Sequence, residues 1–331
     1  MKVIEVITDA GHLDTVKGIA EQFELIDFWY SATDEAGRCS MRLLVQPEQR
    51  QRVMDTLQGM LSGSEDVRIV IYATEAIWPL PQNETEEEKP PVSVTVTREE
   101  LYSQIEKGAR LNGTYLLLVI LSTIVVAIGL LEDNVAVVIG AMVIAPLLGP
   151  NIALALGAAL GDRELIGRSL NTTLAGIVLA FIFCWFIGLL WTGKLDSPEL
   201  LARTYVGLDG IVLALASGLA AALSLTTGLS AVLVGVMVAV ALLPPVATAG
   251  IMTGAGEYTL ATGAALLLAV NIVCVNLSAK LVFLYKGVRP RTWLEKQKAR
   301  QSYTLFLLIW FVSLGILTLV IYLKLAGQMT E

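Results

Sequence analysis

The residues best placed to do chemistry in this chain are prolines and glycines inside long apolar segments. Pro146, Gly149 and Pro150 interrupt one such segment, and Pro244 and Pro245 interrupt another. Because proline has no backbone N–H and clashes with the preceding helical turn, each cluster predicts a kinked or unwound helix. Polar backbone freed at a break is tolerated in a membrane only inside protein or beside water. The sequence therefore predicts that the two breaks line a site for a solute between the two segments.

Side-chain amides and hydroxyls accompany the two breaks. Asn151 and Thr248 follow the prolines, and three further asparagines lie on the neighbouring apolar segments. With the prolines and Gly149, these polar residues complete the predicted substrate-binding set: Asn151, Thr248, Asn171, Asn271 and Asn276. Two alternatives stay open, since the breaks could serve only to shape helix packing and the amides could serve only to join neighbouring helices.

Ionisable residues are scarce in the apolar segments. Lys280 is the only cation well inside one of them, and it lies close enough to the segment's end to extend its ammonium toward the membrane surface. No Asp or Glu occurs in the middle of a segment, which argues against carboxylate-based proton coupling and favours a neutral or anionic solute. The sequence contains no His–Asp pair, Ser–Lys dyad or metal-binding cluster, so we expect no enzyme activity, no cofactor and no metal site.

The apolar segments are long enough to cross a bilayer, which takes about 20 residues in a helix. The sequence predicts seven spans, at about 113–131, 135–157, 168–191, 208–226, 230–253, 260–285 and 303–324. Lys and Arg gather before the first span, between the second and third, and between the sixth and seventh. The positive-inside rule therefore predicts a cytoplasmic N-terminus and an external C-terminus in a prokaryotic cytoplasmic membrane.

The apolar region contains an internal repeat. Residues 136–162 align without a gap on residues 231–257, 95 positions later. The matches include rare residue types: Gly140 with Gly235, Met142 with Met237, Pro150 with Pro245, Gly161 with Gly256, and Asp162 with Glu257. Each unit holds three spans, at about 113–191 and 208–286, and an odd number of spans makes the second unit enter from the opposite side. The predicted fold is a 3+3 inverted repeat with one extra span.

The N-terminal residues predict a small soluble α+β domain. Residues 2–7 and 26–32 are predicted as strands, apolar residues alternate at 39–45 and 67–71, and helical spacing occurs at 12–23 and after residue 47. The order βαββαβ is that of the ferredoxin-like fold. His12 is expected as a solvated residue near a helix start, and Cys39 as a packed residue of the sheet. The net charge of −7 does not suggest a nucleic-acid partner.

These patterns divide the chain into six parts. They are a soluble domain (1–78), an acidic Pro-rich linker (79–96), an amphipathic helix on the membrane surface (97–111), the transmembrane repeat domain (112–286), a basic cytoplasmic loop (287–302), and the seventh span with the C-terminal tail (303–331).

Three stretches resemble a known prokaryotic family: GAMVIAPLLGPNIALALGAALGD (140–162), ALLPPVATAG (241–250) and AVNIVCVNLSAKLVF (269–283). This is the uncharacterised hydrophobic-domain family, catalogued as domain of unknown function 389, and the resemblance covers roughly residues 110–290. It implies an integral membrane protein. It brings no substrate and no site residue, because none is assigned to the family.

We expect a transporter or channel-like permease for a small neutral or anionic solute, regulated by the cytoplasmic N-terminal domain. The inverted repeat and the paired helix breaks are the features that indicate transport. The alternative is a membrane-embedded sensor or scaffold without transport. The expected partners are the lipid bilayer, further copies of the chain in a homo-oligomer, and a small-molecule ligand, with no nucleic acid.

Overall fold

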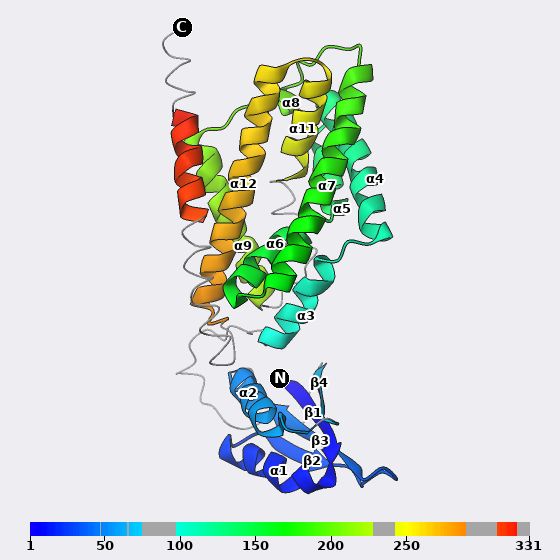
Figure 1. Cartoon of the computed structure of the whole chain (residues 1–331), viewed down its shortest axis with the longest axis vertical. Coiled ribbons are helices and arrows are strands. Elements are labelled where there is room, and N and C mark those ends of the chain that lie inside the picture. Colours follow the sequence, from blue (N-terminus) through cyan, green and yellow to red (C-terminus); the bar gives the residue numbers. More distant parts are fainter. Residues whose placement is uncertain (47, 65, 75–96, 228–241, 289–309, 323–331) are drawn as a thin grey trace. The chain divides into compact units, whose positions relative to one another are not determined.

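The structure is a computed structural model that describes residues 1–46, 48–64, 66–74, 97–227, 242–288 and 310–322 (Figure 1). The chain forms two compact units, Met1–Arg98 and Glu99–Glu331. The linker at 79–96, the basic loop at 287–302 and the predicted spans at 230–253 and 303–324 lie wholly or partly outside the described residues.

The first unit is a four-stranded antiparallel sheet with two helices. Its elements in chain order are β1 (Lys2–Asp9), the short η1 (Ala10–His12), α1 (Leu13–Gln22), β2 (Asp27–Tyr30), β3 (Arg38–Val45), α2 (Arg50–Leu61) and β4 (Arg68–Ala73). The strands lie in the order β2-β3-β1-β4, and each neighbouring pair is antiparallel. Each predicted strand and helix of this unit is present within a few residues of its expected bounds.

One face of the sheet packs on both helices. Ile4, Met41 and Leu43 are fully buried on this face, and Val16 of α1 and Leu57 of α2 are fully buried in the same core. Alternation puts these strand residues on one side of the pleat. Cys39 is buried in the same core, as predicted. The Nε2 atom of His12 lies 2.9 Å from Ser64 Oγ, so this histidine has a protein partner as well as solvent.

The second unit is helical in its described part. Its elements are α3 (Arg98–Gly108), α4 (Gly113–Leu131), α5 (Val135–Ile144), α6 (Leu148–Leu160), α7 (Arg163–Leu190), α8 (Pro198–Ala202), α9 (Leu208–Thr227), α11 (Leu243–Gly254) and α12 (Tyr258–Tyr285), followed by the helix Trp310–Tyr322. The starts of α4, α5 and α7 are fixed by side-chain caps from Asn112, Asn134 and Asp162.

Four described helices, α4, α7, α9 and α12, are long and apolar enough to cross a membrane. A fifth span results if α5 and α6, which meet at a bend of 53°, count as one. Such lengths of apolar helix are those of a membrane protein. The helix Trp310–Tyr322 is apolar but shorter than a span within the described residues.

The interior of this unit is formed by α6 and α11. Eleven of the thirteen residues of α6 and ten of the twelve residues of α11 are buried, a larger share than in the long helices. Figure 1 shows α11 between α7 and α12, and α6 toward the end of the unit where α3 lies, whereas α11 lies toward the end where α8 lies. The two proline-containing segments are therefore enclosed by longer helices.

Candidate functional site: the buried starts of α6 and α11

The break between α5 and α6 follows from Pro146. Proline disfavours the helical conformation at the residue before it, and Ala145 is extended, with ψ 122°. The helix restarts at Leu148 and turns by 53°. Pro146 and Gly149 are partly buried, and Pro150 is buried in the first turn of α6. The break predicted from the sequence is therefore present, and its new helix start lies inside the protein.

The second helix start lies at the corresponding position of the repeat. The first residue of α11 is Leu243, which is 95 positions after Leu148. Pro244 and Pro245 occupy its first turn and are buried. Residues 228–241, which precede this start, lie outside the described part of the chain.

Both helices begin without a side-chain cap. The residues at the cap positions are Leu147 and Leu242, and neither helix start receives a capping hydrogen bond from a side chain among the described residues. The first N–H groups of a helix lack intrahelical partners and carry partial positive charge. The prolines remove some of these donors, and the remaining N–H groups face a protein interior.

Polar side chains with incomplete hydrogen bonding lie one turn from these starts. Asn276 of α12 donates from Nδ2 to Asn151 Oδ1 at 2.5 Å and to the carbonyl of Ile272 at 2.9 Å. Three atoms then have no partner among the described residues: Asn151 Nδ2, Asn276 Oδ1 and Thr248 Oγ1. All three side chains are at most 1% exposed. The contacting pair Asn151 and Asn276 offers an amide donor and an amide acceptor, and Thr248 offers a buried hydroxyl on α11.

The remaining predicted residues divide into two groups. Asn271 is 7% exposed on α12 and belongs to the buried set, but Asn171 is exposed on α7 and does not face the interior.

Lys280 follows Asn276 by one turn and is fully buried. Its ammonium therefore does not extend to the membrane surface as the sequence suggested, because the part of α12 that carries Lys280 is enclosed by neighbouring helices.

A pocket opens at the other end of α11. It has a volume of about 630 Å³ and is lined by the ends of α7 and α11, by the start of α12 and by the loop that contains Trp191, Lys194 and Asp196. Glu257, at the start of α12, also lines it. No sequence pattern predicted this pocket.

Comparison with known proteins places the chain in a family. A protein of Methanocaldococcus jannaschii, described as uncharacterized, is 34% identical over 296 residues, which cover 89% of this chain and 91% of that protein. The family model described as "Domain of unknown function (DUF389)" matches residues 142–277. The chain belongs to the DUF389 family. The matched region runs from α5 to α12 and thus includes both helix starts. No solved structure matches the chain.

The buried polar set of this DUF389 protein consists of amide and hydroxyl groups, which can bind a solute through hydrogen bonds. No group of three His, Cys, Asp or Glu side chains is placed to hold a metal ion within the described residues. The amides and the hydroxyl can exchange hydrogen bonds with a solute, and unmatched buried polar atoms of this kind cost roughly 1–3 kcal/mol each. That cost is removed when a water molecule or a solute binds them.

Proposed function

We propose that this protein is a transporter or channel-like permease for a small neutral or anionic solute, which binds where α6 and α11 begin. The observation that carries the proposal is that Asn151 Nδ2 on α6, Asn276 Oδ1 on α12 and Thr248 Oγ1 on α11 are buried and have no hydrogen-bond partner among the described residues. Neither α6 nor α11 receives a side-chain cap from the described residue at its start. Helix N-termini favour groups with negative charge or lone pairs. Broken helices that meet near the middle of a bundle are the usual solute sites of transporters.

We further propose that the spans form a 3+3 inverted repeat. The helix bounds support this reading, because α7 and α12 are both 28 residues long and begin 95 positions apart, at Arg163 and Tyr258. The turns before them carry Gly161 and Gly256, also 95 positions apart, with positive φ angles of 73° and 85°. A left-handed residue is costly for any side chain other than glycine. The same turn thus occurs at the same place in both halves.

The first unit is proposed as a cytoplasmic, ferredoxin-like regulatory domain. Its element order and strand order support that fold. A ligand of this domain would regulate transport through α3, which joins the two units in sequence. The orientation with the N-terminus inside rests on the distribution of Lys and Arg, and the proposed partners are the bilayer and further copies of the chain.

Flux into liposomes tests the proposed function. The purified full-length protein is reconstituted, and uptake of glycerol, urea, formate, acetate, phosphate and chloride is compared with uptake by empty vesicles. We expect flux of at least one solute, and we expect Asn276→Leu to lower it at least tenfold, because the variant removes the amide that joins α12 to α6. Asn171→Leu is the matched control, since Asn171 is exposed on α7, and it should retain flux. The proposal fails if no solute of this panel enters faster than into empty vesicles.

The alternative is a membrane-embedded sensor or scaffold. The observation that favours it is the extent to which α6 and α11 are buried by protein, with eleven and ten buried residues. Under this alternative the Asn151–Asn276 pair only joins two helices, so Asn276→Leu would lower the melting temperature. Neither the parent protein nor any variant would then show flux.

A further inference from the structure

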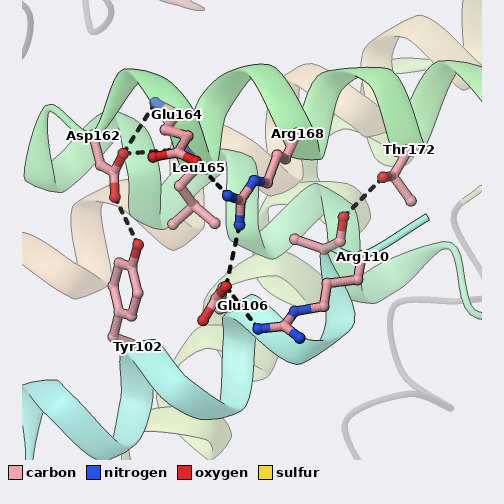
Figure 2. Close-up of polar contacts among 9 residues, drawn as sticks. Tyr102, Glu106, Arg110, Asp162, Glu164, Leu165, Arg168 and Thr172 are labelled. Carbon is pink, nitrogen blue, oxygen red and sulfur yellow. Dashed lines mark hydrogen bonds and ion pairs between the residues drawn. The ribbon is translucent and has the colours of Figure 1, made fainter. Parts of the chain in front are cut away.

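Helix α3 is attached to the turn between α6 and α7 (Figure 2). The hydroxyl of Tyr102 donates to Asp162 Oδ2 at 2.7 Å. The other oxygen of Asp162 accepts from the backbone N–H groups of Glu164 and Leu165, each at 3.0 Å, and so caps α7. Burial, with the hydrogen bond to Asp162, raises the pKa of Tyr102 to about 12, so this hydroxyl keeps its proton at neutral pH. One carboxylate thus binds both helices.

The rest of α3 reaches from this turn to the break. Glu106 accepts from Arg168 of α7 at 3.3 Å and from Arg110 at 3.0 Å (Figure 2). The hydroxyl of Thr172 donates to the carbonyl of Ala109 at 2.8 Å, and both groups are buried. A Cβ atom placed on Gly149 would lie 2.9 Å from the carbonyl oxygen of Gly108. The end of α3 is therefore in backbone contact with the first turn of α6.

The equivalent turn of the second half is open. Gly256 and Glu257 stand 95 positions after Gly161 and Asp162 and lie between α11 and α12. Figure 1 shows the connection between α11 and α12 at the end of the helical unit opposite to α3. Glu257 is exposed, lines the 630 Å³ pocket, and makes no side-chain capping bond with any described residue. Asp162 makes two such bonds and binds Tyr102. The two halves therefore share a turn but differ in whether a neighbouring segment covers it.

A segment that can cover the turn at Gly256–Glu257 lies before α9 in the sequence. Residues 193–203 stand 95 positions after the residues of α3 and contain α8. In this alignment Ser197 corresponds to Tyr102. In this structure Ser197 caps α8 and lies 3.4 Å from Asp133 Oδ1, which also accepts from the N–H of Glu199 at 3.0 Å. The residues just before α8, Gly193 to Asp196, line the pocket beside Glu257.

We propose that the two turns are covered in alternation: α3 covers Gly161–Asp162 while the pocket at Gly256–Glu257 is open, and segment 193–203 covers Gly256–Glu257 when α3 leaves its turn. The inference deepens, and rests on, the proposed transport function. In an inverted repeat, exchanging the conformations of the two halves converts a protein open on one side into one open on the other. Release of α3 would at the same time free the first turn of α6 from Gly108.

Cysteine labelling of the full-length protein tests the alternation. Thr172→Cys reports release of α3, because Thr172 is 1% exposed beneath Ala109. Tyr102→Phe removes one buried hydrogen bond from the covered state, so we expect it to raise the maleimide labelling rate of Thr172→Cys roughly fivefold. Tyr285→Phe, at an exposed tyrosine at the end of α12, should leave the rate unchanged.

The second arm keeps Tyr102 and tests the coupling itself. In the double variant Thr172→Cys/Glu257→Cys, a bulky maleimide first modifies the exposed residue 257 and holds the pocket open. Because coupling between two sites is reciprocal, this adduct should slow labelling at residue 172 several-fold, whereas the same adduct at Tyr285→Cys should not. Equal rates with and without the adduct at residue 257 would overturn the alternation and leave α3 as a locally fraying helix. Coupling without liposome flux would contradict the proposed function alone, and flux without coupling would contradict the alternation alone.

Discussion

Glu5 is the clearest case in which a single side chain stabilises one unit. It lies on β1, on the sheet face opposite to the core residues Ile4 and Val6, and is 5% exposed. Its carboxylate accepts from Ser40 Oγ at 2.5 Å, from Tyr72 Oη at 2.8 Å, and from Arg42 Nε at 2.9 Å. The hydrogen bonds from Ser40 and Tyr72, together with Arg42, hold the pKa of Glu5 below its ordinary value of 4.5. The ionised form is thus favoured by folding.

Stability of the first unit should therefore fall in acid. A lowered folded-state pKa contributes stability that is present above the unfolded pKa and is lost as the pH falls through the folded value. Glu5→Gln in a fragment of residues 1–98, which has a complete core of its own, should lower the free energy of unfolding at pH 7 by about 1–3 kcal/mol. It should also weaken the loss of stability between pH 5 and pH 3, measured by urea denaturation. The control is Glu35→Gln, at an exposed position. An equal acid dependence in parent and Glu5→Gln fragments would contradict this role.

The burial of single residues of the candidate site could be predicted where the residue follows a proline that marks a helix start. Asn151 and Thr248 follow prolines, so the sequence places them near a helix start. Asn171 is the same kind of residue as Asn276, yet it is exposed while Asn276 is buried. The face that an amide occupies on a long, uniformly apolar helix depends on the neighbours of that helix, which the sequence does not reveal. The pairing of Tyr102 with Asp162 spans 60 residues and was not predictable either.

Among the elements, α7 and α11 show how closely the glycines allow helices to approach. A Cβ atom on Gly250 would lie 2.6 Å from the Cβ of Cys184 and 2.7 Å from the carbonyl oxygen of Phe181. A Cβ atom on Gly188 would lie 2.1 Å from the carbonyl oxygen of Ile251. Small residues permit such backbone approach in membrane bundles. The contact joins α7 to α11, the helix whose first turn contains Pro244 and Pro245.

Gly250→Ala should therefore destabilise the helical unit. The three nearest atoms that the new methyl group would meet, Cys184 Cβ, Phe181 O and Trp185 N, belong to backbone or to a Cβ, so none can rotate away. Overpacking of this kind costs about 1–3 kcal/mol. Thermal unfolding of the purified protein in detergent should show a lower melting temperature. Gly167→Ala on α7 is the matched control, because its Cβ would meet no atom within 4 Å among the described residues, and it should leave the melting temperature unchanged or raise it slightly. Equal melting temperatures for the two variants would show that the α7–α11 contact is looser than described.

At the scale of the whole molecule, hydropathy and proline placement predicted the long helices and the break. The span predicted at 135–157 exists as two helices, because Pro146 forces Ala145 into an extended conformation. The apolar side of the surface helix predicted at 97–111 is buried as Leu101 and Ile105 of α3. An amphipathic pattern indicates that one side of a helix is covered, but it does not distinguish lipid from protein as the cover. The pocket beside Glu257 arises from two stretches of the chain that are far apart in sequence, 188–196 and 254–260, and it had no sequence signature.

The proposed inversion predicts on which side of the membrane the first residues of α7 and α12 lie. Arg163 and Tyr258 are the first residues of α7 and α12, occupy equivalent positions of the two halves, and are both exposed. In an inverted repeat they lie on opposite sides of the membrane, whereas in a parallel repeat they lie on the same side. The distribution of Lys and Arg predicts that Arg163 lies on the cytoplasmic side. Single cysteines at these two positions therefore distinguish the architectures.

In intact cells, a membrane-impermeant maleimide should label Tyr258→Cys at once and Arg163→Cys only after the membrane is opened. The three native cysteines, Cys39, Cys184 and Cys274, are buried, and the parent protein gives the background. If both variants are labelled in intact cells, or both only after lysis, the two halves share one orientation. The alternation of α3 with segment 193–203 would then lose its basis, because those segments would cover turns on the same side. Labelling of Arg163→Cys alone in intact cells would keep the inversion and reverse the assigned sides.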